Sequence, residues 1–270
     1  MDKYRVFGNP IEQSKSPAIH QAFARQTDQP INYEKELVAL NDFENTVQSF
    51  IKKGGKGANV TAPFKEQANK LCDHLSDCAR LSGAVNTLSF INGKIYGDNT
   101  DGLGLVKDIQ AHQVEFKDAN ILLIGAGGAA KGVVSSLLAQ QPKLLVITNR
   151  TVAKAQQIVD QYPVENIESS TLADIIKFHF DIIINATSAG LTGDSLPIPK
   201  QVITKKTVCY DMVYGKKLTP FLQVAKELGA LQVIDGLGML VGQAAESFSI
   251  WRNVKPKTND ILQKLREELS

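Results

Sequence analysis

The spacing of apolar and polar residues over the first hundred positions predicts short strands that alternate with helices. Pro17 stands in the first turn of the first expected helix, and Ser16 is its expected N-cap. Strands are predicted at 3–8, 31–40 and 56–61, and helices at 17–26, 42–54 and 63–75.

A hairpin and a further helix close this first block. The stretch AVNTLSFINGKIYGDNT (84–100) has Asn92 and Gly93 at its centre, and this dipeptide is the strongest short signal for a hairpin turn. A helix is expected to begin after Asp101.

From about residue 120 the pattern changes to apolar runs without alternation, separated by helical stretches. Strands that are buried on both faces have this pattern. We therefore expect 102–237 to form a parallel, doubly wound sheet. The runs lie at 120–125, 144–148, 181–185, 208–213 and 231–234.

The chain becomes helical again after residue 237. One helix connects the two blocks near 102–112, and another leaves the second block near 237. This placement allows the last helices to return to the first block and to leave a cleft between the two.

Composition narrows the class of protein. Hydrophobic residues make up 43% and charged residues 21%, which is ordinary for a globular protein. A net charge of +2 gives no reason to expect a nucleic acid partner. No eighteen consecutive residues are apolar, and no apolar run follows a basic head at the start, so neither a membrane span nor a secretory signal is expected. The three cysteines are odd in number, which favours a reducing compartment, and we expect the cytoplasm.

The stretch NILLIGAGGAAKG (120–132) carries the first candidate site. It places the spacing G-x-G-x-x-A between an apolar strand and a helix, which is the context that makes this pattern informative. Gly125 would form the tight turn, Gly127 would allow close approach of a ligand, and Ala130 would pack the helix on the strand. A pyrophosphate would lie against the free N–H groups at the start of the helix. The alternative is a glycine turn without a ligand.

Cations follow the next strand, where dinucleotide-binding units usually carry an acid. Asn149 and Arg150 occupy that place, and Lys154 lies one turn further on. An acid would repel a 2′-phosphate, whereas a guanidinium binds it through a planar fork. The expected cofactor is therefore NADP(H), although an exposed surface arginine is the simpler alternative.

Lys65 and Asp101 are the candidates for proton transfer. In NVTAPFKE, Thr61 is the expected N-cap and Pro63 an early helix position, so Lys65 is a cation in the first turn, where the helix dipole disfavours it. A surface lysine and an ordinary N-capping aspartate are the alternatives for the two residues. Tyr-x-x-x-Lys, the arrangement of short-chain reductases, does not occur. Cys72, His74 and Cys78 fall on one expected helix with a spacing that does not suit zinc, and we expect no metal.

Polar residues at expected loops and strand ends surround these two. Such positions open into the sites of α/β proteins, and hydroxyls with amides suit a small polyhydroxylated substrate. Each residue also has an ordinary use in a turn or cap. They are Ser14, Ser16, Asn59, Thr61 and Asn86.

Nine motifs together resemble the shikimate dehydrogenase family, in its order and spacing. They are SKSP, NVTAPFK, AVNT, GDNTDGLG, GAGGAAKG, NRT, NATSAG, YDMVY and DGLGMLVGQAA, and the resemblance runs from about residue 4 to 252. It implies an α/β protein with a Rossmann-type NADP domain (102–237) and a discontinuous substrate domain (1–101 and 238–270) completed by the C-terminal helices. It further implies NADP-linked interconversion of 3-dehydroshikimate and shikimate by a monomer or homodimer. Many relatives have a proline soon after the tyrosine of YDMVY, whereas GKKLTPFL follows here.

The resemblance also implies a role for individual residues. Lys65 would be the acid–base residue, paired with Asp101. Ser14 and Ser16 would bind the substrate carboxylate, and Thr61, Asn86, Asp101 and Gln243 the ring hydroxyls, with Asn59 and Tyr214 close by. The implied cofactor-binding residues are Asp77, Gly125, Ala126, Gly127, Gly128, Ala129, Asn149, Arg150, Thr151, Lys154, Thr187, Ser188, Met212 and Gly236. A quinate/shikimate dehydrogenase with relaxed specificity and a non-catalytic NADPH-binding module are the alternatives.

Overall fold

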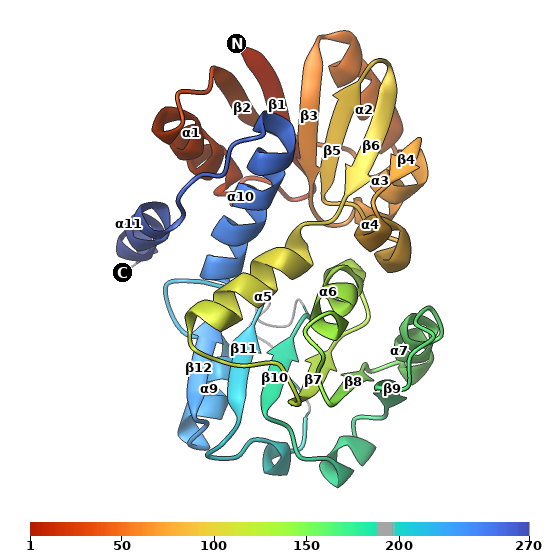
Figure 1. Cartoon of the computed structure of the whole chain (residues 1–270), viewed down its shortest axis with the longest axis vertical. Helices are drawn as coiled ribbons and strands as arrows, with labels where there is room; N and C mark the ends of the chain where they lie inside the picture. The colour runs from red at the N-terminus through yellow and green to blue at the C-terminus, as the bar shows by residue number, and fades with distance from the viewer. Residues whose placement is uncertain (188–195, 197, 270) are drawn as a thin grey trace.

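Two six-stranded sheets, joined by long helices, make up the computed structural model, which describes residues 1–187, 196 and 198–269 (Figure 1). The sheet in the upper half of Figure 1 consists of β1 (Asp2–Gly8), β2 (Ile31–Leu37), β3 (Gly55–Val60), β4 (His74–Leu75), β5 (Thr87–Ile91) and β6 (Lys94–Asp98). The lower sheet consists of β7 (Asn120–Ile124), β8 (Leu144–Thr148), β9 (Ile167–Ser170), β10 (Ile182–Asn185), β11 (Val208–Asp211) and β12 (Gln232–Asp235).

The first sheet is mixed, with the order β2-β1-β3-β5-β6-β4. β1 pairs in parallel with β2 and β3, whereas β5 is antiparallel to both β3 and β6. The expected hairpin joins β5 and β6. Asn92 and Gly93 both have positive φ, at 51° and 75°, which is the backbone that this two-residue turn requires.

The second sheet is parallel throughout, with the order β12-β11-β10-β7-β8-β9. This is the doubly wound order of dinucleotide-binding folds, and the chain reverses direction across the sheet between β7 and β10. The predicted fold class is therefore confirmed. Strand β9 was not predicted because its sequence, IESS, is short and polar, as an edge strand allows.

Helices cover both faces of the parallel sheet. One face packs on α5 (Asp101–Ala111), α6 (Gly128–Leu138) and α7 (Val152–Val159), which lie in front of it in Figure 1. The other face packs on α9 (Pro220–Glu227) and on two short 3₁₀ turns, η1 (Asp174–Lys177) and η2 (Lys200–Val202). Successive residues of β7 enter the two cores in turn, since Leu122 faces one and Leu123 the other.

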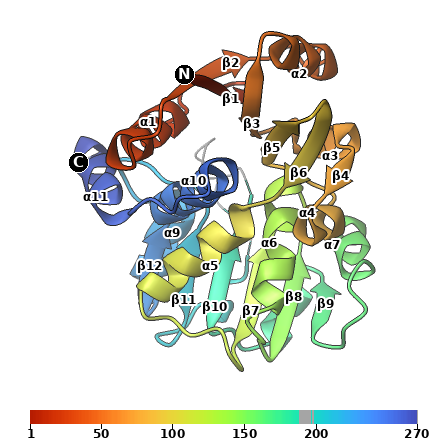
Figure 2. The same ribbon diagram turned by 45° about the horizontal axis from the view of Figure 1, so that its top comes forward.

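The mixed sheet is covered in the same way. On one side lie α2 (Phe43–Lys52), α3 (Lys65–Leu71) and α4 (Asp77–Ser82). On the other side lie α1 (Ser16–Gln26), α10 (Leu237–Arg252) and α11 (Asn259–Leu269). Leu237, Val241 and Phe248 of α10 share one core with Tyr4 and Val6 of β1. Helix α10 also packs along α5, and the two lie between the sheets in Figure 2.

Several expected local features are wrong. Helix α1 begins at Ser16, and the N-cap position is Lys15. Helix α3 begins at Lys65 because a turn closed by the Phe64 N–H and the Thr61 carbonyl (3.0 Å) precedes it, so Thr61 is not its cap.

Cys72, His74 and Cys78 do not share a helix. They lie after α3, in β4 and in α4, and the described residues contain no group of side chains suited to a metal ion. Within the same residues, no helix has both the length and the apolar content needed to cross a bilayer.

Candidate active site

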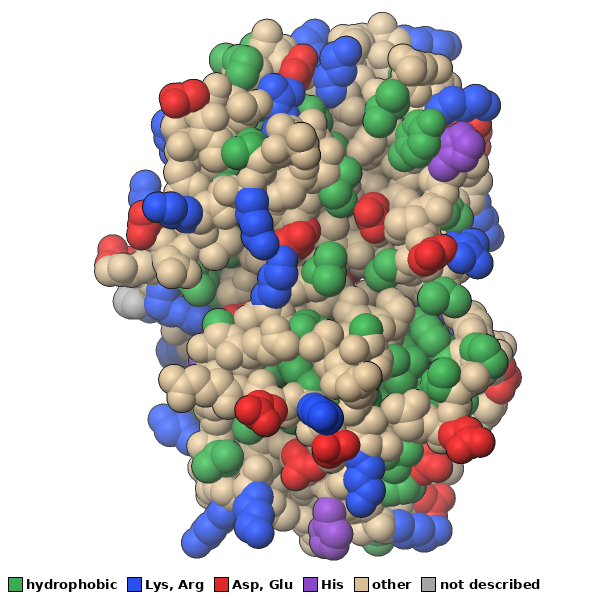
Figure 3. All heavy atoms as spheres, in the orientation of Figure 1, with side chains coloured by type: hydrophobic (Ala, Val, Ile, Leu, Met, Phe, Trp, Pro, Cys, Tyr) green, Lys and Arg blue, Asp and Glu red, His purple; other side chains and the backbone are tan. Residues whose placement is uncertain are grey.

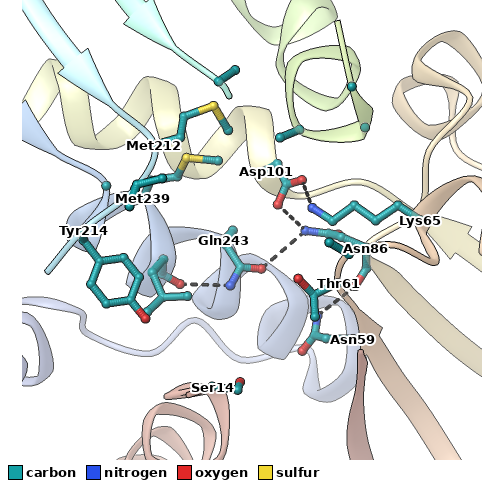
Figure 4. A pocket seen from close by; sticks show the side chains of 18 of the residues that line it. Ser14, Asn59, Thr61, Lys65, Asn86, Asp101, Met212, Tyr214, Met239 and Gln243 are labelled. Carbon is teal, nitrogen blue, oxygen red and sulfur yellow. Dashed lines mark hydrogen bonds and ion pairs between the residues drawn. The ribbon is translucent and has the colours of Figure 1, made fainter. Parts of the chain in front are cut away.

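A cavity of about 1000 Å³ lies where the two sheets meet, and side chains from both line it (Figure 4). The parallel sheet contributes the loops after β7, β8, β10 and β11. In an open α/β sheet, ligands bind beyond the carboxyl ends of the strands, at the point where the strand order reverses. The cavity occupies that position.

An ion pair stands at the centre of the cavity. Lys65 is the first residue of α3, Asp101 is the first residue of α5, and the Lys65 Nζ atom donates to Asp101 Oδ2. The side chains are 17% and 7% exposed. Lys65 is therefore not a solvated surface lysine. Asp101 does not cap its helix either, because the N-cap position is Thr100 and the carboxylate points into the cavity.

A chain of amides extends from this ion pair to α10. Asn86 Nδ2 donates to Asp101 Oδ1 (2.8 Å) and approaches Gln243 Oε1 (3.3 Å). Gln243 Nε2 in turn donates to the Leu240 carbonyl (3.0 Å). These bonds fix the orientation of the acid and both amides, so that the pair is held by residues from three separate parts of the chain.

Asn59 lines the same wall, but the protein occupies its polar atoms. Its Oδ1 accepts from the Tyr33 hydroxyl (2.7 Å), and its Nδ2 lies 3.0 Å from Ser247 Oγ and 3.1 Å from the Asn86 carbonyl. Asn59 is also 6% exposed. The structure thus gives Asn59 a supporting position behind Asn86.

The far wall carries the paired serines and an apolar surface. Ser14 and Ser16 line the cavity at the start of α1, and the Ser16 N–H donates to Ser14 Oγ (3.3 Å). Tyr214, Leu240 and Leu269 line the cavity as well. Burial raises the pKa of the Tyr214 hydroxyl, and Asp235 adds to this effect. Tyr214 is therefore a neutral hydrogen-bonding group near pH 7.

The glycine turn after β7 fits a pyrophosphate. Gly125 has a φ of +120°, and a Cβ atom there would lie 3.1 Å from the Ala186 carbonyl oxygen. A Cβ atom on Gly127 would meet no atom within 4 Å, and no side chain caps the following helix α6. The first N–H groups of α6 therefore face open space in which an anion has room to bind. The buried Ala130 allows the close packing of α6 on the sheet.

Most residues named from the sequence come together in this cavity, and a few do not. Asn149 lines it, whereas Arg150, Thr151 and Lys154 are not among the lining residues; they follow Asn149 in the sequence and are exposed, before and in the first turn of α7. Asp77 lies outside it, exposed on α4 and paired with Arg80. Ser188 lies outside the described residues. The predicted residues that line the cavity are Ser14, Ser16, Asn59, Thr61, Lys65, Asn86, Asp101, Gly125, Ala126, Gly127, Gly128, Ala129, Asn149, Thr187, Met212, Tyr214, Gly236 and Gln243.

Sequence reasoning missed other parts of the site. Leu269, at the end of the last helix, lines the cavity, and no local pattern indicates this. Thr87 and Thr100 support Asn86 by hydrogen bonds, and both stand next to residues that the motifs already singled out. Basic and acidic side chains are interspersed on the face of the molecule shown in Figure 3.

Comparisons with known proteins agree with this geometry. Three family models match: a shikimate dehydrogenase substrate binding domain at residues 6–88, a shikimate/quinate 5-dehydrogenase at 106–193, and a shikimate 5′-dehydrogenase C-terminal domain at 236–266. A shikimate dehydrogenase (NADP(+)) from Colwellia psychrerythraea is 57% identical over 268 residues, which are 99% of this chain and 98% of that protein.

Solved structures give the same result. An Ael1 enzyme from Pseudomonas putida is similar with a TM-score of 0.93 at 42% identity, and the match covers 98% of each chain. A shikimate dehydrogenase in complex with NADP+ has a TM-score of 0.91 at 31% identity, over 100% of this chain and 96% of that one. Because these matches extend over both sheets and nearly the full sequence, the chain belongs to the shikimate dehydrogenase family.

Proposed function

We propose that the cavity holds NADPH and 3-dehydroshikimate side by side, and that Lys65 transfers the proton while Asp101 orients it. The chain catalyses the NADP-linked interconversion of 3-dehydroshikimate and shikimate, an oxidoreductase step toward chorismate and the aromatic amino acids. Bound NADPH supplies the hydride, from C4 of the nicotinamide to the C3 carbonyl carbon. The residues of this chain must then place the substrate and provide a proton for the new hydroxyl.

One observation carries the assignment of the proton donor. Lys65 stands between the two parts of the site, because its Nζ is bound to Asp101 and its Cβ lies 3.8 Å from the position that a Cβ on Gly128 would occupy. Gly128 begins the helix whose N-terminus fits the pyrophosphate. An ammonium in this position can give its proton to the developing alkoxide and take it back in the reverse direction. Asp101 keeps it in place, and Asn86 in turn holds Asp101.

The remaining polar residues are assigned by their places on the walls. Ser14 and Ser16 bind the substrate carboxylate at the start of α1. Thr61, Asn86 and Gln243 bind ring hydroxyls, and Tyr214 closes the side toward α11. Asn59 acts from behind, since the bonds described above already use its amide.

Arg150 and Lys154 bind the 2′-phosphate of NADP(H). Both side chains are exposed beside Asn149, which lines the cavity, and within the described residues neither forms an ion pair. Two unpaired cations next to the ribose position favour a phosphate dianion over a hydroxyl. This placement supports a preference for NADP(H) over NAD(H).

The packing of α10 supports a division of the chain into two domains. We propose a substrate domain of residues 1–101 and 238–270 and an NADP domain of residues 102–237, supported by the core that α10 shares with β1. A cytoplasmic location is supported by three free cysteines. We propose that the protein is a monomer or a homodimer, and sedimentation velocity distinguishes the two.

Absorbance at the nicotinamide band tests the substrate and the cofactor together. Shikimate and quinate are each paired with NADP+ and with NAD+, and we expect fast reduction only for shikimate with NADP+. Comparable rates with quinate would instead support the quinate/shikimate dehydrogenase with relaxed specificity.

Lys65→Ala tests the proton donor. Positioned proton transfer contributes about 10²- to 10⁴-fold, so kcat should fall by about that factor while shikimate binding changes little. Lys70→Ala removes an exposed lysine from the same helix and is the matched control. A Lys65→Ala variant with near-normal kcat would exclude this lysine from the chemistry.

A further inference from the structure

Two loops at neighbouring strand ends line the cavity next to the glycine turn, and the proposed function would place the nicotinamide against them. One follows β10 and contains Thr187, and the other follows β11 and contains Met212. The last main-chain bond between the two strands joins the Met212 N–H to the Asn185 carbonyl (2.9 Å). Beyond that bond, within the residues that the structure describes, side chains connect the ends of the two strands.

The side chains of Asn185 and Asp211, here called the Asn185–Asp211 clasp, make this connection. Asn185 Nδ2 donates to Asp211 Oδ1 (3.1 Å). On one side, Asn185 Oδ1 accepts from the Thr187 N–H (3.0 Å) and the Thr187 hydroxyl (2.7 Å). On the other side, Asp211 Oδ1 accepts from the Val213 N–H (3.0 Å), and Asp211 Oδ2 accepts from the Thr219 hydroxyl (2.5 Å).

Water cannot replace these hydrogen bonds, because the side chains that make them are buried. Asn185 and Asp211 are both 0% exposed, and Asp211 ends a strand whose residues are all buried. Leaving a buried polar group without a partner is costly, so Thr187 and the Met212 loop are held where these side chains are satisfied. Neither side chain points its polar atoms at a ligand, because the protein uses them.

We propose that Asn185 and Asp211 are positioning residues that hold Thr187 and the Met212 loop at the separation the nicotinamide ring requires. The proposal rests on the proposed function of the cavity and assigns the two residues no contact with substrate or cofactor. The adenosine end of the cofactor would bind beyond β8, which β7 separates from β10 and the clasp. The clasp should therefore affect the nicotinamide end alone.

Asn185→Leu replaces the amide by a side chain of similar size that makes no hydrogen bond. We expect kcat to fall at least tenfold, because small misplacements of reacting atoms cost large factors in rate. The dissociation constant of NADPH, followed by its fluorescence, should rise about tenfold. That of adenosine 2′,5′-bisphosphate, which has the 2′-phosphate and no nicotinamide, should change less than twofold.

A conservative variant and a matched control complete the test. Asp211→Asn keeps an oxygen that accepts from Asn185 and Val213, and its amide can donate to the Thr219 hydroxyl. This variant should therefore keep at least a third of the parent kcat. Asp211→Leu, which makes none of these bonds, should fall below that value. Thr207→Val removes another buried hydrogen bond at the opposite end of β11, from the Thr207 hydroxyl to the Phe180 carbonyl (3.1 Å). It should leave both affinities unchanged. Should Asn185→Leu fail to fold, Thr219→Val removes the outer bond to Asp211, together with the cap that the Thr219 hydroxyl provides to the Leu222 N–H (3.4 Å). It should weaken NADPH two- to fivefold without affecting the bisphosphate.

Different outcomes would refute the role of the Asn185–Asp211 clasp and the proposed function of the cavity. Equal loss of affinity for NADPH and the bisphosphate, a kcat within twofold of the parent in Asn185→Leu, or the same losses in Thr207→Val would overturn the clasp. Loss of kcat in Asp211→Asn equal to that in Asp211→Leu would overturn the role of Asp211. Absence of NADP+ reduction with shikimate in the parent would refute the proposed function itself.

Discussion

His20 should make the free energy of unfolding depend on pH, and His20→Phe should remove that dependence. The imidazole is 0% exposed, and neither ring nitrogen has a hydrogen-bond partner of ordinary geometry within the described residues; the nearby Asn59 raises the pKa of His20, but less than burial lowers it. It stacks on Tyr33, with ring centroids 4.2 Å apart, and lies among Phe23, Phe248 and Trp251. Burial lowers the pKa of His20 from 6.5 to about 3.

The sign follows from where the proton binds. Because the pKa of His20 is lower in the folded chain, the unfolded chain binds the extra proton between pH 6.5 and about 3. The stability that neutral His20 allows is therefore complete above pH 6.5 and is lost as the pH falls. Each pH unit below 6.5 is worth about 1.4 kcal/mol for such a group, so a change from pH 7 to pH 5 should cost about 2 kcal/mol.

Urea unfolding at pH 7 and pH 5 measures this difference. Trp251 is the single tryptophan, and its ring centroid is 5.3 Å from that of His20, so its fluorescence reports on this core. The parent should lose about 2 kcal/mol more than His20→Phe between the two pH values. His179→Gln, at an exposed position, is the control and should behave as the parent. Equal losses in the parent and His20→Phe would refute the reasoning.

Two further substitutions test the cofactor site and the packing of α10. Arg150→Asp should weaken NADPH binding at least tenfold, because a lost charge-assisted bond costs about 1.5–3 kcal/mol. Lys143 is exposed beyond the other end of β8, so Lys143→Asp is the control and should leave NADPH binding unchanged. Equal NADPH affinities in the two variants would contradict the 2′-phosphate assignment. Gly238→Ala should lower the free energy of unfolding by about 1–3 kcal/mol in urea titrations, because the new Cβ would lie 2.0 Å from Oδ1 of Asp108, whose buried carboxyl accepts from the Tyr210 hydroxyl (2.7 Å). The control Gly215→Ala, whose new Cβ would have its nearest atom at 3.6 Å, should lower it by less. An unchanged free energy of unfolding in Gly238→Ala would show that α10 can shift.

The sequence predicts those features of the fold that depend on local periodicity. Apolar runs predicted five of the six strands of the parallel sheet, and Asn92 with Gly93 predicted the hairpin. Strand β9 was not predicted because its pairing at the edge of the sheet, and not its composition, makes it a strand. The start of α3 was misplaced because a turn at Thr61 takes the place of a cap.

The site likewise has one part that the sequence predicts and another part that it does not. Glycines and cations next to strands predict a nucleotide site, since their chemistry depends on neighbours in sequence. Leu269 and the Asn185–Asp211 clasp depend on contacts between distant segments, and neither has a local signal. The partners of Asn59 could not be predicted either, because Tyr33 and Ser247 reach it from strands and helices far along the chain.

The shared core of β1, α1, α10 and α11 bears on biosynthesis. Tyr4 and Val6 leave the ribosome more than 200 residues before Leu237, Phe248 and Leu265, which supply part of the apolar surface that covers them. Part of the apolar face of β1 and α1 therefore stays uncovered while the intervening parallel sheet is synthesised. Chains terminated before α10 would keep that face exposed, which makes them natural clients for chaperones and proteases.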